Sequence, residues 1–155
     1  MDSKNYFVGL GYDSHKFVRG KKLVLGGLEI DFPFGLKAHS DGDVVLHSVA
    51  DAILGACGMK DIGEIFPDSE EKYKNIDSKI IIKKILRDIR KKKFRLVNID
   101  IVVVCDKPKI SPMKDKIKKS LCEIFGIKNI NIKGKTTEGE ESNFIKVFSV
   151  VMVKR

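Results

Sequence analysis

The stretch that most constrains this chain covers residues 38–51 and reads AHSDGDVVLHSVAD. It sets two of the three histidines of the protein among apolar residues spaced as in a buried helix. We expect that helix to begin at Ser40 as N-cap, with Asp43 in the place of a capping-box acid. Asp43, His47 and Asp51 then share one helical face. Titratable groups on a buried helix destabilise the fold unless they are paired or bind a ligand. The helical face with Asp43, His47 and Asp51 therefore predicts a functional site.

The rest of the chain mixes short β-type runs with amphipathic helices, which predicts an α+β fold of two layers. Helices are expected at about 41–57, at 78–92 with Ser78 as cap, and from Ser111 to about Phe125. Strands are expected at 6–12, 23–25, 28–30, 95–105, 129–135 and 144–153.

The last of these runs is apolar on both faces, so we expect it at the centre of a sheet or covered by another subunit. The pattern as a whole predicts a mixed four-stranded sheet with helices on one face. At 155 residues, the chain is expected to be a single domain over 1–155.

Composition excludes several classes of protein. No run of 18 apolar residues occurs, so we expect no membrane span. Cys57, Cys105 and Cys122 are odd in number and form no C-x-x-C, which argues against a disulfide framework and for a reduced, intracellular, soluble protein. The first residues lack the features of a secretory signal or a transit segment.

The net charge of +9 is concentrated in a basic stretch over 83–95. Such a stretch can bind nucleic acid or can be the solvated face of a helix. Only one aromatic residue, Phe94, interrupts the run from Arg90 to Arg95, which makes a poor platform for stacking bases. We favour the solvated face and expect no nucleic-acid partner.

A short D-x-H pattern follows the first strand run. Asp13 and His15 are two residues apart, so an extended backbone places them on the same face. Together with His47 they offer one carboxylate and two imidazoles, a set that suits Zn²⁺ with a fourth position open. Zinc used in this way is a Lewis acid or a template. A lone histidine on an apolar helix can also be a hydrogen-bonded core residue, so the spacing leaves both interpretations open.

Three further features indicate a phosphorylated substrate. His39 and Ser40 precede a helix N-terminus, 136–138 is a hydroxyl-rich turn with a carboxylate, and 107–109 is a basic loop. Glu138 could hold a hard cation such as Mg²⁺. Ordinary capping and turn chemistry is the alternative for each feature. A metal-dependent phosphohydrolase is a second function compatible with them.

Five motifs, in order along most of the chain, carry a family resemblance: GYDSH (11–15), AHSDGDVVLH (38–47), DIGEIFPDS (61–69), PK (108–109) and TTE (136–138). They resemble the 2-C-methyl-D-erythritol 2,4-cyclodiphosphate synthases of the non-mevalonate isoprenoid pathway. The resemblance implies a cyclising phosphorus–oxygen lyase that acts on 4-diphosphocytidyl-2-C-methyl-D-erythritol 2-phosphate. The 2-phosphate attacks the β-phosphorus, CMP leaves, and a cyclic diphosphate forms.

The same resemblance implies a homotrimer whose sheets face the three-fold axis, with active sites between subunits. It implies a location in the bacterial cytoplasm or the plastid stroma, any leader being absent from this chain. His39 and Thr136 resemble the catalytic groups beside the reacting phosphates. Glu138 resembles the ligand of a second divalent ion, Mg²⁺ or Mn²⁺. The residues that resemble the zinc ligands are Asp13, His15 and His47.

The implied substrate contacts form a wall for the methylerythritol at 61–68, a cytosine pocket at 105–111, and phosphate contacts elsewhere. Together these positions are Asp13, Ser14, His15, His39, Ser40, Asp61, Ile62, Gly63, Phe66, Pro67, Asp68, Cys105, Pro108, Lys109, Ser111, Thr136, Thr137 and Glu138.

The segment after Glu138 departs from the family pattern. The family continues there with a glycine-rich loop that carries a phenylalanine and an arginine, and then with a glutamate on the last strand. This chain reads GEESNFIKVFSVVMV, which is shorter, lacks that arginine and has no acid after Glu141. The resemblance therefore does not extend to the family's Arg–Glu pair at the trimer axis.

Overall fold

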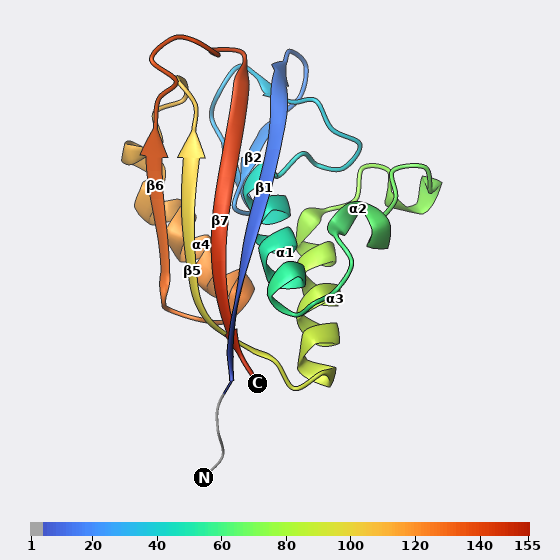
Figure 1. The fold of residues 1–155 in the computed structure, drawn as a ribbon. Coiled ribbons are helices and arrows are strands. Elements are labelled where there is room, and N and C mark those ends of the chain that lie inside the picture. The colour runs from blue at the N-terminus through green and yellow to red at the C-terminus, as the bar shows by residue number, and fades with distance from the viewer. Residues whose placement is uncertain (1–4) are drawn as a thin grey trace.

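The computed structural model describes residues 5–155 and shows a two-layer α+β fold (Figure 1). The larger sheet has five strands in the order β4-β1-β7-β5-β6. Their bounds are Tyr6–Val18 for β1, Gly35–Leu36 for β4, Arg95–Val104 for β5, Ile130–Lys135 for β6 and Phe144–Lys154 for β7. Strands β5 and β6 are parallel, and the other pairs are antiparallel.

The mixed sheet is confirmed, but the expectation of four strands is wrong. Strand β1 was expected to end at Tyr12 and instead continues to Val18. Its last two residues pair with the two-residue strand β4, which becomes the fifth strand. A strand of two residues has no alternation of its own, so the sequence pattern does not reveal it. Strands β2, Leu23–Leu25, and β3, Leu28–Ile30, lie where they were expected, and they pair with each other in a separate two-stranded sheet.

Three longer helices cover one face of the sheet (Figure 1). They are α1, Val44–Ala56, which packs on β1 and β7; α3, Ser78–Lys91, which packs beside α1; and α4, Lys114–Phe125, which packs on β6. Shorter turns complete the layer: α2, Ile62–Ile65, and the 3₁₀ turns η1, Glu71–Tyr73, and η2, Ser111–Met113. No helix among residues 5–155 is both long and apolar enough to cross a membrane.

The helix starts differ from the expected caps. The N-cap of α1 is Asp43 rather than Ser40, because its buried carboxylate accepts from the backbone N–H of Leu46 at 3.0 Å. The same carboxylate accepts from Gly26 N at 3.0 Å and from Gly27 N at 2.6 Å, in the β2–β3 turn. Helix α1 therefore begins where a distant hairpin supplies donors, a contact that local sequence does not show.

The other two expected caps are also wrong. Asp77 caps α3 by accepting from Lys79 N at 2.8 Å, which leaves Ser78 inside the first turn. Ser111 is the first residue of η2, and α4 continues from that turn without a side-chain cap.

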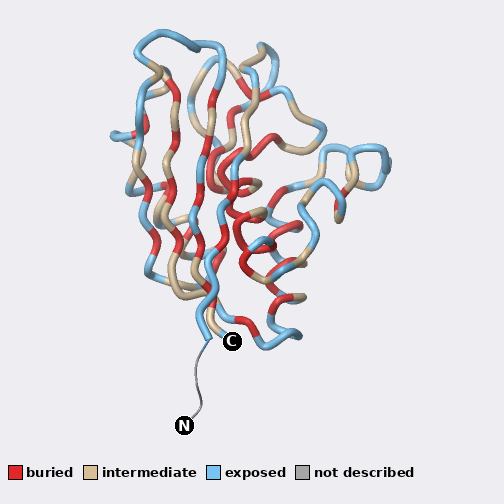
Figure 2. The backbone as a smooth tube through the Cα atoms, viewed as in Figure 1, coloured by how far each residue is buried: buried red, intermediate tan, exposed pale blue. Residues whose placement is uncertain are grey.

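Strand β7 lies between β1 and β5, as its apolar pattern predicts. Its odd-numbered residues, among them Ile145, Val147 and Val151, are buried under the helices. Its even-numbered residues are exposed or half-buried, so burial alternates along the strand (Figure 2). They lie on the opposite face of the sheet, which no helix of residues 5–155 covers. That face carries large apolar side chains that are 41–69% exposed: Tyr6, Val8, Leu10, Tyr12, Phe144, Phe148 and Val150.

Candidate active site

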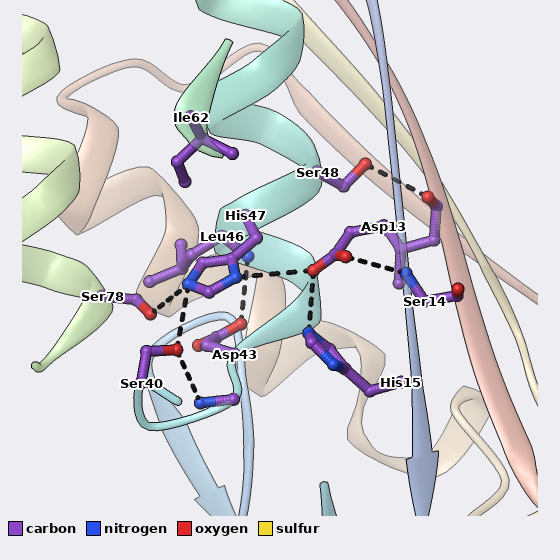
Figure 3. A network of polar contacts seen from close by, with 12 residues as sticks. Asp13, Ser14, His15, Ser40, Asp43, Leu46, His47, Ser48, Ile62 and Ser78 are labelled. Carbon is purple, nitrogen blue, oxygen red and sulfur yellow. Dashed lines mark hydrogen bonds and ion pairs between the residues drawn. The ribbon is translucent and has the colours of Figure 1, made fainter. Parts of the chain in front are cut away.

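Asp13, His15 and His47 come together where α1 crosses β1 (Figure 3). The first two lie within β1 and point toward the helix layer, as their alternation predicts. Nε2 of His15 lies 3.0 Å from Oδ2 of Asp13, and Nδ1 of His47 lies 3.4 Å from the same oxygen. The three ligand atoms are all within 4.8 Å of one another. The expected cluster of one carboxylate and two imidazoles is therefore present.

The cluster fits a metal ion. Oδ2 of Asp13 and Nε2 of His15 are buried and have no hydrogen-bond partner among the described residues. Their 3.0 Å contact lacks the geometry of a donor facing an acceptor. Buried polar atoms without a partner are rare in folded proteins. A divalent cation between these atoms would satisfy both, and this donor set suits such an ion.

Asp13 and the two imidazoles each affect the protonation of their neighbours. Burial alone would raise the pKa of Asp13, but the neighbouring imidazoles of His15 and His47 outweigh it and lower this pKa to about 2. Burial likewise disfavours a charged imidazole at His47, but the Asp13 carboxylate prevails and raises the pKa of His47 above its ordinary value. Asp13 is thus anionic at neutral pH, ready to bind a cation.

The cluster forms one side of a cavity of about 470 Å³. The loop before α1 and the segment around α2 form the other walls. Six predicted site residues line the cavity in addition to the cluster: His39, Ser40, Ile62, Gly63, Phe66 and Asp68. Asp51 holds α2 against α1 by accepting from Ile62 N at 2.8 Å, and burial raises the pKa of Asp51.

Three residues predicted for this site do not line the cavity. The backbone N–H of Ser14 donates to Oδ1 of Asp13 at 2.9 Å. Asp61 is the N-cap of α2 and forms a reciprocal capping box with Glu64. Pro67 is half-buried beside Phe66 but is not part of the lining.

Sequence reasoning missed five lining residues, namely Lys37, Ala38, Tyr73, Ile76 and Ile81. Lys37 could have been found because it directly precedes the AHSDGD motif. The ring of Tyr73 packs edge-on against Phe66, with 5.3 Å between ring centroids. No local pattern predicts this pairing.

The remaining predicted residues lie around the ends of β5 and β6. Cys105, Lys109, Ser111 and Thr136 line a second, smaller cavity of about 180 Å³. Burial raises the pKa of the Cys105 thiol to about 11, and this thiol donates to the carbonyl oxygen of Pro108.

Thr137 and Glu138 do not line this second cavity. Thr137 is held by the Asp106 carboxylate, which accepts from its backbone N–H at 2.7 Å and from its hydroxyl at 2.8 Å. Glu138 is exposed and accepts from the Thr136 hydroxyl at 2.9 Å. It is not part of the Asp13 cluster. One chain therefore carries the predicted site residues in two separate places.

Comparisons with known proteins agree with this fold. A model of the YgbB family matches residues 6–154. The 2-C-methyl-D-erythritol 2,4-cyclodiphosphate synthase of Aquifex aeolicus (strain VF5) is 49% identical over 151 residues, which cover 95% of this chain and 97% of that protein.

Solved structures show the same likeness. The bifunctional IspDF from Campylobacter jejuni matches with a TM-score of 0.93 and 39% identity, over 98% of this chain and 43% of that longer one. A 2C-methyl-D-erythritol-2,4-cyclodiphosphate synthase in a CDP-bound form matches with a TM-score of 0.89 and 32% identity, over 94% of this chain and 99% of that one. Because the family model matches almost the whole chain and a relative is 49% identical over 95% of it, the chain belongs to the YgbB family.

Proposed function

We propose that this chain converts 4-diphosphocytidyl-2-C-methyl-D-erythritol 2-phosphate into 2-C-methyl-D-erythritol 2,4-cyclodiphosphate and CMP. Relatives that share about half of its sequence are named for this product, and a solved relative is described with CDP bound. The observation that carries the proposal is the pair of buried, unpartnered atoms of Asp13 and His15 beside a cavity of about 470 Å³.

The reaction requires little acid–base chemistry. An oxygen of the 2-phosphate forms a bond to the β-phosphorus, and the bond from that phosphorus to the bridging oxygen breaks. CMP leaves with the bridging oxygen, and no water is consumed. Because the nucleophile is already an anion, the site has to align two groups that repel each other and neutralise their charge.

The larger cavity offers groups for that work. We assign Asp13, His15 and His47 to Zn²⁺, which when bound would supply positive charge beside the phosphates. His39, which lines the same cavity, donates hydrogen bonds to phosphate oxygens, and the Lys37 ammonium adds positive charge to the cavity. The apolar surface of Ile62 and Phe66 is suited to contact the methyl group and carbon chain of the substrate. The segment from Asp61 to Asp68, which contains α2, forms the wall for the methylerythritol part of the substrate.

The smaller cavity holds the other end of the substrate. We assign the loop from Cys105 to Ser111, with Pro108 and Lys109, to the cytosine. The hydroxyl of Thr136 approaches the diphosphate, and Thr137, held by Asp106, fixes the turn beside it. Glu138 binds a second divalent ion, Mg²⁺ or Mn²⁺, which such carboxylates hold together with substrate phosphates.

We further propose a homotrimer whose sheets face the three-fold axis. The uncovered face of the sheet supports it, since Leu10 is 69% exposed and Val8 is 61% exposed within a contiguous apolar surface. Surfaces of this kind mark protein contacts. Packing three such faces together would bury them. We place each active site between the larger cavity of one subunit and the smaller cavity of its neighbour.

A ³¹P NMR assay tests the proposal. The protein is incubated with the diphosphocytidyl substrate, Zn²⁺ and Mg²⁺. We expect two mutually coupled phosphorus signals from a cyclic diphosphate and one signal from CMP, in equal amounts. A chelated sample is the control and should give neither product. Inorganic phosphate or a linear diphosphate as the product would contradict the proposal and indicate a phosphohydrolase.

A further inference from the structure

His47 makes a second contact on the side of its ring away from Asp13 (Figure 3). Its Nε2 lies 2.9 Å from Oγ of Ser78, a residue of α3 that is 1% exposed. The Ser78 hydroxyl donates in turn to Oδ1 of Asp41 at 2.5 Å, and the Ser78 backbone N–H donates to Oδ2 of Asp41 at 3.0 Å. A partly buried chain of hydrogen bonds therefore runs from Asp41 through Ser78 to the imidazole.

The direction of each hydrogen bond in this chain is fixed by chemistry. The carboxylate of Asp41 can only accept, so the Ser78 hydroxyl has to give it its proton. The Ser78 oxygen then presents only lone pairs to His47, so Nε2 has to be the donor. A neutral imidazole carries one proton, so Nδ1 is left with a lone pair. Nδ1 is the atom that faces Asp13.

Ser40 reinforces the same arrangement. Its Oγ lies 3.3 Å from Nε2 of His47 and accepts from Gly42 N at 3.1 Å. It can accept from Nε2 as well, because an oxygen of this kind has two lone pairs. The loop before α1 and the first turn of α3 therefore both hold the outer edge of this imidazole.

We propose that Asp41 and Ser78 are positioning residues that fix His47 in the Nε2–H tautomer and so prepare Nδ1 to bind the metal. The inference rests on the proposed function only in requiring a metal ion at the Asp13–His15–His47 cluster. It explains why Asp77 rather than Ser78 caps α3, since the Ser78 side chain is engaged with His47 and Asp41. Partners of this kind orient metal-binding imidazoles, and their loss weakens metal affinity by about 10–100-fold.

Zinc affinity tests the proposal by competition with a chromophoric chelator. Ser78→Ala keeps a good helix former and removes only the hydroxyl, so we expect zinc to bind about 10–100-fold more weakly. Ser48→Ala is the matched control. Ser48 is a buried serine of α1 whose hydroxyl contacts Ser149 Oγ at 2.8 Å and Val147 O at 3.2 Å, away from the cluster. It should leave zinc affinity unchanged.

A second measurement needs no variant. In zinc-loaded wild-type protein, ¹⁵N NMR of the His47 ring should show the proton on Nε2 and the metal on Nδ1. The opposite assignment would overturn the proposal, as would a folded Ser78→Ala that binds zinc as tightly as the wild type. A wild-type protein that binds no zinc would overturn the metal centre itself. If the wild type has cyclase activity and Ser78→Ala binds zinc as tightly as the wild type, the proposed function stands. Only the positioning role of Asp41 and Ser78 is then excluded.

Discussion

Gly11 of β1 and Ser48 of α1 are in direct backbone contact, so close that a Cβ atom on Gly11 would lie 1.9 Å from the carbonyl oxygen of Ser48. Gly9 makes the same kind of contact one helical turn further along, at 2.0 Å. A helix can approach a strand this closely only where the strand carries no side chain. The close crossing brings Nδ1 of His47 to 3.4 Å from Oδ2 of Asp13 and so assembles the Asp13–His15–His47 cluster.

Gly11→Ala should therefore damage both stability and the site. The added methyl meets backbone that cannot rotate away, so we expect a loss of at least about 3 kcal/mol, the upper end for overpacking. Zinc affinity should also fall, because α1 has to move away from β1. Urea unfolding and a zinc titration measure the two effects.

Gly55→Ala is the control for that substitution. Gly55 lies in α1, and an added Cβ there would have nothing within 4 Å. The substitution should therefore be neutral or stabilise the protein by about 0.5–1 kcal/mol. Equal stability of the two variants would contradict the contact.

Metal binding and phosphate stabilisation should separate in two variants. Asp13→Asn keeps the size of the side chain but removes its charge, so the protein should lose both bound zinc and CMP release. His39→Ala removes a side chain that lines the cavity but does not belong to the Asp13–His15–His47 cluster. Zinc should therefore stay bound, while CMP release falls by about 10²–10³-fold because a hydrogen-bond donor to the phosphates is lost. Metal analysis after gel filtration and an assay of CMP measure the pair. Loss of zinc from His39→Ala would contradict the assignment.

Much of the architecture could be predicted because it depends on local pattern. The alternation in β5 and β7 and the apolar stripe of α3 fix those elements from short stretches of sequence. The D-x-H spacing placed Asp13 and His15 on one face without knowledge of the fold. That His47 would meet them followed from the donor set and the family resemblance, not from any local pattern.

What could not be predicted depends on contacts between distant segments. Ser40 and Ser78 both have the sequence of an N-cap, yet Asp43 and Asp77 cap the two helices. Asp43 prevails because the β2–β3 turn presents two backbone donors to its carboxylate. Both displaced serines contact His47 instead. The errors at the helix starts thus coincide with the surroundings of the Asp13–His15–His47 cluster, and departures from local preference are expected around functional sites.

Asp43 should titrate well above an ordinary aspartate. Burial raises its pKa from 3.8 to about 6, and the nearby Asp41 carboxylate adds to the rise, while the three backbone donors limit it. Between about pH 4 and 6 the folded chain binds a proton that the unfolded chain does not. The contribution of Asp43 to stability therefore decreases as the pH rises through this window, by up to about 3 kcal/mol.

The pH dependence of the ¹³C signal of the Asp43 carboxyl group measures its pKa directly, with an expected midpoint near pH 6. Urea unfolding at several pH values gives the accompanying change in stability. A carboxyl midpoint below pH 4 would show instead that the backbone donors outweigh burial, and the sign of the stability change would reverse.

The uncovered face of the sheet should hold subunits together. Leu10→Glu places a charge on that face, at a side chain that is 69% exposed in the single chain. Burying an unpaired charge between subunits is costly, so sedimentation should show a shift from trimer to monomer. Ile80→Glu is the matched control, because Ile80 is 57% exposed on α3, on the other side of the molecule. A Leu10→Glu protein that sediments as the wild type does would exclude this face as the interface.

Two inactive variants should restore activity to each other if each active site is shared between subunits. His47→Ala damages the larger cavity, and Thr136→Ala damages the smaller one. In a mixed trimer, one boundary joins an intact larger cavity to an intact smaller cavity. Random assembly from equal amounts then gives about one quarter of the wild-type number of sites.

The measurement is CMP release after the two variants are unfolded and refolded together. A mixture of His47→Ala with Asp13→Asn is the control, because both substitutions damage the same cavity and no boundary can be intact. Activity in the first mixture alone would establish shared sites. If neither mixture is active while each variant still forms trimers, both cavities of one site come from the same chain.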